Sequence, residues 1–210
     1  MRLKTLLLIL VFYFSIVRAV AQESPYFQQT EIGVLRGKGP QNWDGSRTDR
    51  NNLSLHTFHG IKLHPKHVLG LSTGLDFYDQ LTLIPIAIGW RGFLGKENKP
   101  QLVGGIDIGG GAAFVEKKTS TEWEESWYEG GAMTSAHLGV RLPAWKGKSA
   151  LSVSIGFKRQ EASYSYAYKN GLLIPPTSFV PTGILPRGYE SLSETYYVFQ
   201  SLFFRMGLMF

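Results

Sequence analysis

The chain has 210 residues, no cysteine, 24 glycines and 18% charged residues, with 22 lysines and arginines against 16 acids. The absence of cysteine excludes a disulfide scaffold, a cysteine-ligated zinc site and a thiol nucleophile. A hydrophobic fraction of 43% is ordinary for a folded protein, and the length suits one all-β domain, so we expect neither disorder nor a second domain.

The first 21 residues have the pattern of a secretory signal peptide. Arg2 and Lys4 precede an apolar run over residues 6–17, and residues 19–21 (Ala-Val-Ala) provide a small-x-small cleavage site. The apolar run is too short for a membrane-spanning helix, which needs about 20 residues. We therefore expect residues 1–21 to direct export and to be removed, followed by a short lead over residues 22–29.

Removal of this segment also changes the charge of the protein. Arg2, Lys4 and Arg18 lie within it, whereas all 16 acids follow it, so the net charge falls from +6 to +3. Because the basic excess is partly a targeting feature, we expect no nucleic-acid partner.

From residue 30 onward, apolar and polar residues alternate with a period of two. Leu53, Leu55, Ile61 and Leu63, for example, share one parity of their segment. This pattern is typical of half-buried strands. It predicts an all-β fold with eight antiparallel strands, at 30–37, 51–63, 67–78, 81–94, 101–115, 131–142, 149–162 and 192–210. Segment 81–94 is the least regular, since it is apolar on both parities around Pro85.

The expected connections differ at the two ends of these strands. Three are short, at residues 64–66, 95–100 and 143–148. At the other end they are 38–50, a tight pair at 79–80, 116–130 and 163–191. Short turns at one rim and mostly long loops at the other are typical of outer-membrane barrels. An even number of strands places both termini at the short-turn side.

Glycines indicate which face of the alternation points inward. They share the parity of the polar residues, and the lumen of a narrow barrel needs small residues beside long charged ones. Charges facing lipid would instead cost roughly 2–4 kcal/mol each near midplane. The parity predicts an inward network of Asp76, Arg91, Asp107, His137, Arg141, Lys158 and Arg205, to which Glu31 and Glu194 are candidate additions.

The end of the sequence carries the most specific pattern. Reading back by twos, the residues Phe210, Leu208, Met206, Phe204 and Leu202 are all apolar. This stripe resembles the C-terminal assembly signal of bacterial outer-membrane β-barrels. With the strand count, the chain resembles the eight-stranded OmpX/OmpA-like, porin-like barrels. The resemblance implies an up-and-down transmembrane β-barrel in the outer membrane with periplasmic termini, whose partners are outer-membrane lipid, lipopolysaccharide and the barrel-assembly machinery.

Residues capable of catalysis or metal binding do not form convincing sites. Lipid A deacylases resemble this fold, but Ser135 and His137 both take the inward parity, where an acyl chain could not reach them. His56 faces inward, His59 outward, and His64 and His67 flank a turn, so a zinc site is not expected. We expect no catalytic residue, no cofactor and no metal.

Function therefore depends on the lumen and the loops. An eight-stranded barrel is just wide enough for side chains to fill it, which favours a plug over a pore. Loops 116–130 and 163–191 hold Trp123, Trp127, Tyr128 and further aromatic residues, which either contact an extracellular ligand or form an aromatic girdle and the upper strand ends. We expect a monomeric structural or surface-binding protein. A small porin or transport component is the alternative, and a lipid-modifying enzyme comes third.

Overall fold

The computed structural model describes residues 25–41, 43–78, 81–96, 98–144, 149–169 and 189–210. The expected signal segment 1–21, the turn 79–80, residues 145–148 of another turn and residues 170–188 of the expected loop 163–191 lie outside this part of the chain. None of the described residues forms a helix long and apolar enough to cross a membrane.

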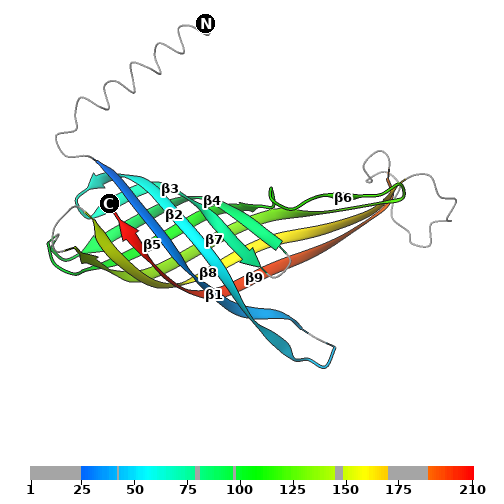
Figure 1. Ribbon diagram of the computed structural model, residues 1–210, viewed down its shortest axis with the longest axis horizontal. Helices are drawn as coiled ribbons and strands as arrows, with labels where there is room; N and C mark the ends of the chain where they lie inside the picture. Colours follow the sequence, from blue (N-terminus) through cyan, green and yellow to red (C-terminus); the bar gives the residue numbers. More distant parts are fainter. Residues whose placement is uncertain (1–24, 42, 79–80, 97, 145–148, 170–188) are drawn as a thin grey trace, which may run out of the picture.

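Nine strands make up the described fold. They are β1 (Tyr26–Gln41), β2 (Arg47–His64), β3 (His67–Tyr78), β4 (Leu81–Leu94), β5 (Gln101–Ala112), β6 (Thr119–Ser120), β7 (Glu124–Pro143), β8 (Ala150–Lys169) and β9 (Tyr189–Met209). All are antiparallel to their neighbours, and pairing of β1 with β9 and of β5 with β7 closes eight of them into a ring (Figure 1). The prediction of eight antiparallel strands is therefore confirmed, and β6 is an added two-residue strand beside β7.

The start of β1 and the end of β9 lie at the same end of the ring, as an even number of strands requires. Gln28 and Phe210 exchange backbone hydrogen bonds of 3.2 and 2.8 Å, which extends the β1–β9 pairing to the last residue. The turns between β2 and β3 and between β4 and β5 lie at this same end (Figure 1). We call it the short-turn end.

Several strands are longer than the alternation predicted, and they lengthen at the opposite end. The β1–β2 hairpin reaches Gln41 and Arg47, so most of the expected loop 38–50 is a two-stranded arm. β7 begins at Glu124 and β8 ends at Lys169, which removes half of the expected loop 116–130 and the start of loop 163–191. The reason is that β7 and β8 stay paired on both sides of a register shift between Gly130 and Met133, which interrupts the local alternation but not the sheet.

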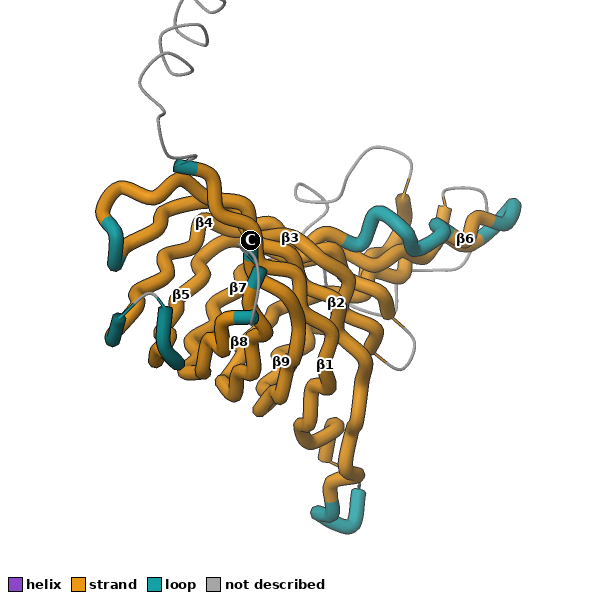
Figure 2. Tube along the Cα trace, turned by 60° about the vertical axis from the view of Figure 1, so that its left-hand side comes forward, coloured by secondary structure: helices purple, strands orange, loops and turns teal. Residues whose placement is uncertain are grey.

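The lengthened strands form two separate projections beyond the ring. One is the β1–β2 arm, and the other is the outer extension, made of β7 residues 124–130, β8 residues 162–169 and β9 residues 189–200. Figure 1 shows them diverging from one side of the ring, and Figure 2 shows the same separation from another direction.

Glycines keep the ring narrow where strands or long side chains come close. A Cβ on Gly105 would lie 2.3 Å from Cε1 of His137, and one on Gly89 would lie 2.2 Å from Oδ1 of Asp107. The space beside these glycines is therefore filled by side chains of the lumen. At Gly207 the obstacle is backbone, since a Cβ would lie 1.9 Å from the carbonyl oxygen of Thr30 in β1.

This packing predicts that Gly207→Ala weakens the β1–β9 seam. Its methyl group would have to displace backbone of β1, so we expect the free energy of unfolding to fall by about 1–3 kcal/mol, as in other overpacked sites. Gly104→Ala is the matched control, because its Cβ would lie 3.5 Å from the nearest atom, Cδ2 of Leu138. Urea unfolding of the two refolded variants measures the difference, and equal stabilities would contradict the close packing of this seam.

Candidate functional site: the lumen and the outer extension

The inside of the ring is divided into three layers along its axis. At the short-turn end lies an apolar cluster of Phe27, Phe58, Val68, Phe93, Val103, Ala150 and Met209. At the other end lies a second cluster of Leu35, Tyr78, Leu81, Leu83, Ala162 and Phe203. Polar and charged residues occupy the layer between them. The order follows directly from the strands: in β9, inward residues Met209, Arg205 and Phe203 belong to the three layers in turn.

The second cluster explains why strand 81–94 is apolar on both parities. Leu81 and Leu83 point inward and are almost completely buried, whereas Ile86 and Ile88 point outward and are exposed. Above the cluster, the guanidinium of Arg50 stacks on the rings of Tyr78 and Phe199, at 5.3 and 4.7 Å.

The central layer balances its charges. Its carboxylates are Glu31, Asp76 and Asp107, and its strong bases are Arg91, Lys158 and Arg205, all at most 2% exposed. Equal numbers of opposite charges reduce the cost of burial, which is several kcal/mol for each unpaired ion.

Arg91 and Asp107 form one ion pair of this layer. Nη1 of Arg91 lies 2.9 Å from Oδ1 of Asp107, and Nη2 donates to Oδ2 at 3.1 Å, a two-point contact between neighbouring strands. Ser135 also donates to Oδ2 of Asp107, at 3.1 Å. The Arg91 guanidinium stacks on the Phe58 ring at 4.1 Å, which connects this pair to the apolar layer below.

Lys158 and Asp76 form the second pair, across the lumen from β8 to β3. Asp76 accepts a further hydrogen bond of 2.8 Å from Ser54, whose hydroxyl in turn accepts one of 3.2 Å from Nη2 of Arg205. Glu31 accepts hydrogen bonds from Ser152 and Ser154, at 2.9 and 3.2 Å. Small hydroxyl residues therefore connect ions that do not touch.

Two of the expected network members lie at its margins. Arg141 is only half-buried and donates to Oε1 of Gln101 at 3.0 Å, near the short-turn end. Glu194, a candidate addition, is exposed on β9 and accepts a hydrogen bond from Tyr196, so its assignment to the lumen is wrong. Residue 194 has the outward parity of Leu202 and Phe204, so the alternation of β9 itself places it outside.

Ser135 and His56 both lie near Oδ2 of Asp107, whereas His59, His64 and His67 lie elsewhere. Ser135 donates to Asp107, and both ring nitrogens of the buried His137 have no hydrogen-bond partner in the described part of the chain. His56 lies inside, 4.0 Å from Asp107, while His59 lies outside and bonds to Tyr26. His64 and His67 lie side by side at the turn, with ring centroids 5.6 Å apart. Among the described residues, no three histidine or acidic side chains are grouped to hold a metal ion.

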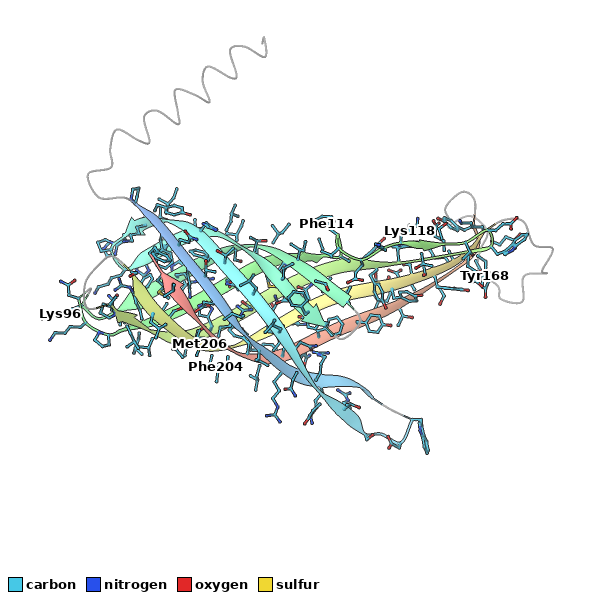
Figure 3. The ribbon with its side chains drawn as sticks, viewed as in Figure 1. Lys96, Phe114, Lys118, Tyr168, Phe204 and Met206 are labelled. Carbon is cyan, nitrogen blue, oxygen red and sulfur yellow. The ribbon has the colours of Figure 1, made fainter. Side chains whose placement is uncertain are left out.

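The C-terminal stripe lies on the outside of the ring. Leu202, Phe204, Met206, Leu208 and Phe210 are each about half exposed, and the residues between them point inward. Figure 3 shows the side chains of Phe204 and Met206 projecting from the outer surface.

The expected loop contacts belong mainly to the outer extension. Trp123 precedes β7, whereas Trp127 and Tyr128 lie within it, so their assignment to a loop is wrong. Trp127 and Tyr128 occupy opposite faces: Tyr128 lies 4.8 Å from the Tyr164 ring, and Trp127 donates to Glu129 at 2.8 Å. Trp127 and Tyr128 therefore lie near the end of a long strand, as the second interpretation expected, and not in a loop that contacts a ligand.

An ion-pair cluster connects β7 and β9 of this extension to the segment before β6. The ammonium of Lys118 lies 3.0 Å from the carboxylate of Glu125 and 4.8 Å from the centre of the Trp127 ring. Glu125 also accepts a hydrogen bond from the hydroxyl of Tyr189. The hydrogen bonds from Tyr189 and Lys118 hold the pKa of Glu125 below its usual value. Figure 3 shows Lys118 and Tyr168 on this part of the molecule, away from the ring.

Comparisons with known proteins add little to this geometry. No protein-family model and no curated protein matches the sequence. Among solved structures, the chain is similar to the outer membrane protein AlkL, determined by solid-state NMR in DMPC lipid bilayers, with a TM-score of 0.44 and 8% identity over 88% of each chain. A similarity of this size supports no inference about function, so the conclusions below rest on the molecule's own surfaces.

The Lys158–Asp76 pair yields a test of the lumen network. Asp76→Asn leaves the Lys158 ammonium buried without its counterion, so we expect a loss of about 3–5 kcal/mol in the free energy of unfolding. Adding Lys158→Met should restore part of this loss, because the second change removes the orphaned charge. Asp49→Asn, in the exposed pair with Lys38, is the control and should change little. Urea unfolding of these four proteins and of Lys158→Met alone provides the comparison, and additive losses would show that the two residues do not interact.

Proposed function

We propose that the ring is an integral outer-membrane β-barrel with a sealed lumen, acting as a structural or surface-binding protein through its outer extension. The observation that carries this proposal is an apolar outer surface to which every strand of the ring contributes. Its most exposed members include Leu71 61%, Ile88 62%, Ile108 63%, Leu138 71%, Ile155 62% and Leu202 61%, one from each of β3, β4, β5, β7, β8 and β9. Water-soluble monomers rarely expose apolar patches that extend so far.

The apolar outer surface is bounded at both ends. Toward the extension, the outward positions change from Phe157 to Arg159 in β8 and from Leu202 to Gln200 in β9. At the short-turn end, the exposed Leu63 and Leu94 lie beside lysines of the turns. A band limited in this way supports a hydrocarbon-facing belt flanked by polar head groups. The outer extension then lies beyond the membrane.

Orientation follows from the same division of the molecule. Outer-membrane barrels have short periplasmic turns and longer extracellular segments. We therefore assign the short-turn end, where β1 begins and β9 ends, to the periplasm. The β1–β2 arm and the outer extension are then assigned to the cell surface. The apolar stripe of β9 lies outside the ring, where the barrel-assembly machinery and membrane lipid, including lipopolysaccharide, can contact it.

The layered lumen favours a structural or binding role over transport. Two apolar clusters enclose the paired charges, and the space beside Glu31, His137 and Ser154 does not admit a water molecule. A porin needs a continuous aqueous path, which this packing does not provide. A small transport component stays the alternative, and a lipid-modifying enzyme the third candidate, since Ser135 and His137 do not form a pair that faces lipid. We propose a monomer without cofactor.

Substitution of a belt residue tests the membrane assignment. Ile155→Arg places a charge in hydrocarbon and should lower the free energy of unfolding in lipid vesicles by roughly 2–4 kcal/mol. Gln200→Arg, also outward but beyond the belt, should have little effect, and Ile155→Leu controls for packing. If Ile155→Arg were as stable as Gln200→Arg, the outer surface would face water and the proposed barrel would be wrong.

Planar-bilayer recordings test the sealed lumen. We expect the refolded protein to insert without steady conductance steps, because both apolar clusters block the passage of hydrated ions. Replacing Leu35, Leu83 and Phe203 together by alanine should open the second cluster. Replacing Phe27 and Phe93 as well should open the cluster at the short-turn end. Steady steps from the unmodified protein would instead support the porin alternative.

A further inference from the structure

Strand β9 has a neighbour on both sides for only part of its length. It pairs with β8 along its whole course, but with β1 only from Ser201 to Met209. The last pair of that seam joins Gly37 to Ser201, and beyond it the β1–β2 arm diverges (Figure 1). In the described part of the chain, no strand covers the free side of β9 over residues 191–200. We call this segment the β9 edge.

The β9 edge lacks the devices that usually protect such edges. Natural edge strands carry lysine, proline or a bulge, which prevents pairing with other chains. Residues 191–200 contain no lysine and no proline, and their register with β8 is continuous. On the opposite side of the extension, β7 is covered by β6, which pairs at Ser126 and Glu125. The β1–β2 arm, by contrast, carries Lys38 and Asp49 as an ion pair.

The side chains at the β9 edge indicate the chemistry of a partner. Tyr196 and Val198 point outward and are 74% and 49% exposed, beyond the belt boundary at Gln200. Glu194 is exposed beside them. In its described residues the extension also carries Glu124, Glu125, Glu129 and Glu190, against Lys169 as its one base, which is an acidic excess. A basic strand would therefore be attracted to this surface.

We propose that the β9 edge is a docking site for an extended peptide segment of another protein, which adds to the sheet as a further strand and carries lysine or arginine on its outward face. The backbone groups of β9 bind any extended chain, and its acids select basic ones. This inference rests on the proposed function, because it requires residues 191–200 to lie in water outside the membrane. A second copy of this chain is a poorer occupant, since it would bring the same acidic edge.

The test uses the full-length protein refolded in lipid nanodiscs. Because the chain has no cysteine, Val198→Cys provides a unique thiol for a fluorophore, and Asn98→Cys provides a matched label at the short-turn end. The probe is a peptide of five Thr-Lys repeats with a nitroxide quencher. Its controls are five Thr-Glu repeats and the Thr-Lys peptide N-methylated at every residue, which has no backbone N–H left to form the strand ladder.

We expect saturable quenching at residue 198 by the Thr-Lys peptide, at least tenfold weaker binding of both control peptides, and no saturable signal at residue 98. Tyr196→Lys, which adds the usual protection of an edge, should weaken binding at least tenfold, whereas Asn98→Lys should not. Equal binding of the N-methylated peptide would overturn strand addition. Energy transfer between labelled copies without peptide would overturn the heterologous partner in favour of a second copy.

Quencher accessibility separates failure of this inference from failure of the proposed function. A water-soluble quencher should reach the label at Val198→Cys, and a lipid-borne quencher should reach one at Ile155→Cys. If that pattern holds and the Thr-Lys peptide does not bind, the docking site is wrong and the barrel stands. If the pattern is reversed, the membrane placement itself is wrong.

Discussion

Closure of eight strands into one ring determines most of what the interior contains. A ring of this size has a lumen just wide enough for side chains, and its inward positions must be filled without crowding. The chain meets this limit with glycine where backbones approach, as at Gly207 beside Thr30, and with serine where a hydroxyl can reach a carboxylate, as at Ser152 and Ser154 beside Glu31. Substitutions that add volume there act on the seam between strands before they act on any side-chain contact.

The distribution of charge follows from the same closure. In the proposed barrel, a lysine or aspartate on the outward face would lie in the apolar belt. The charged residues of the central layer point inward, where Arg91 and Lys158 each reach a carboxylate and Glu31 and Arg205 reach serine hydroxyls. The two apolar clusters flank this layer, and burial there strengthens the Arg91–Asp107 and Lys158–Asp76 pairs but makes each orphaned ion costly. Specific pairs of this kind favour one register of the ring.

Sequence periodicity predicted the ring better than its ends. A period of two is a local property, so eight strands, their parity and the inward side of Asp76, Arg91 and Lys158 could be predicted. The pairing of Lys158 with Asp76, 82 residues away, depends on the stagger between strands and could not. The start of the outer extension was missed because the register of β7 and β8 shifts between Gly130 and Met133, which interrupts the local alternation there. Glu194 was misplaced although its parity is that of the outward Leu202. Layering explains the double apolar parity near Leu83, which local periodicity could not.

The level at which β1 and β9 separate bears on where the proposed membrane belt ends. In hydrocarbon an unpaired N–H or C=O group costs several kcal/mol, whereas in water it costs little, so a strand can lose its neighbour only beyond the belt. The last β1–β9 pair is Gly37 with Ser201, one residue beyond the outward Leu202 and directly before the polar Gln200. The pairing of β1 with β9 is therefore lost at the level where Gln200 interrupts the apolar outward residues of β9, before the exposed Val198 and Tyr196. In the proposed barrel, this level is the one at which the outer edge of the belt would lie.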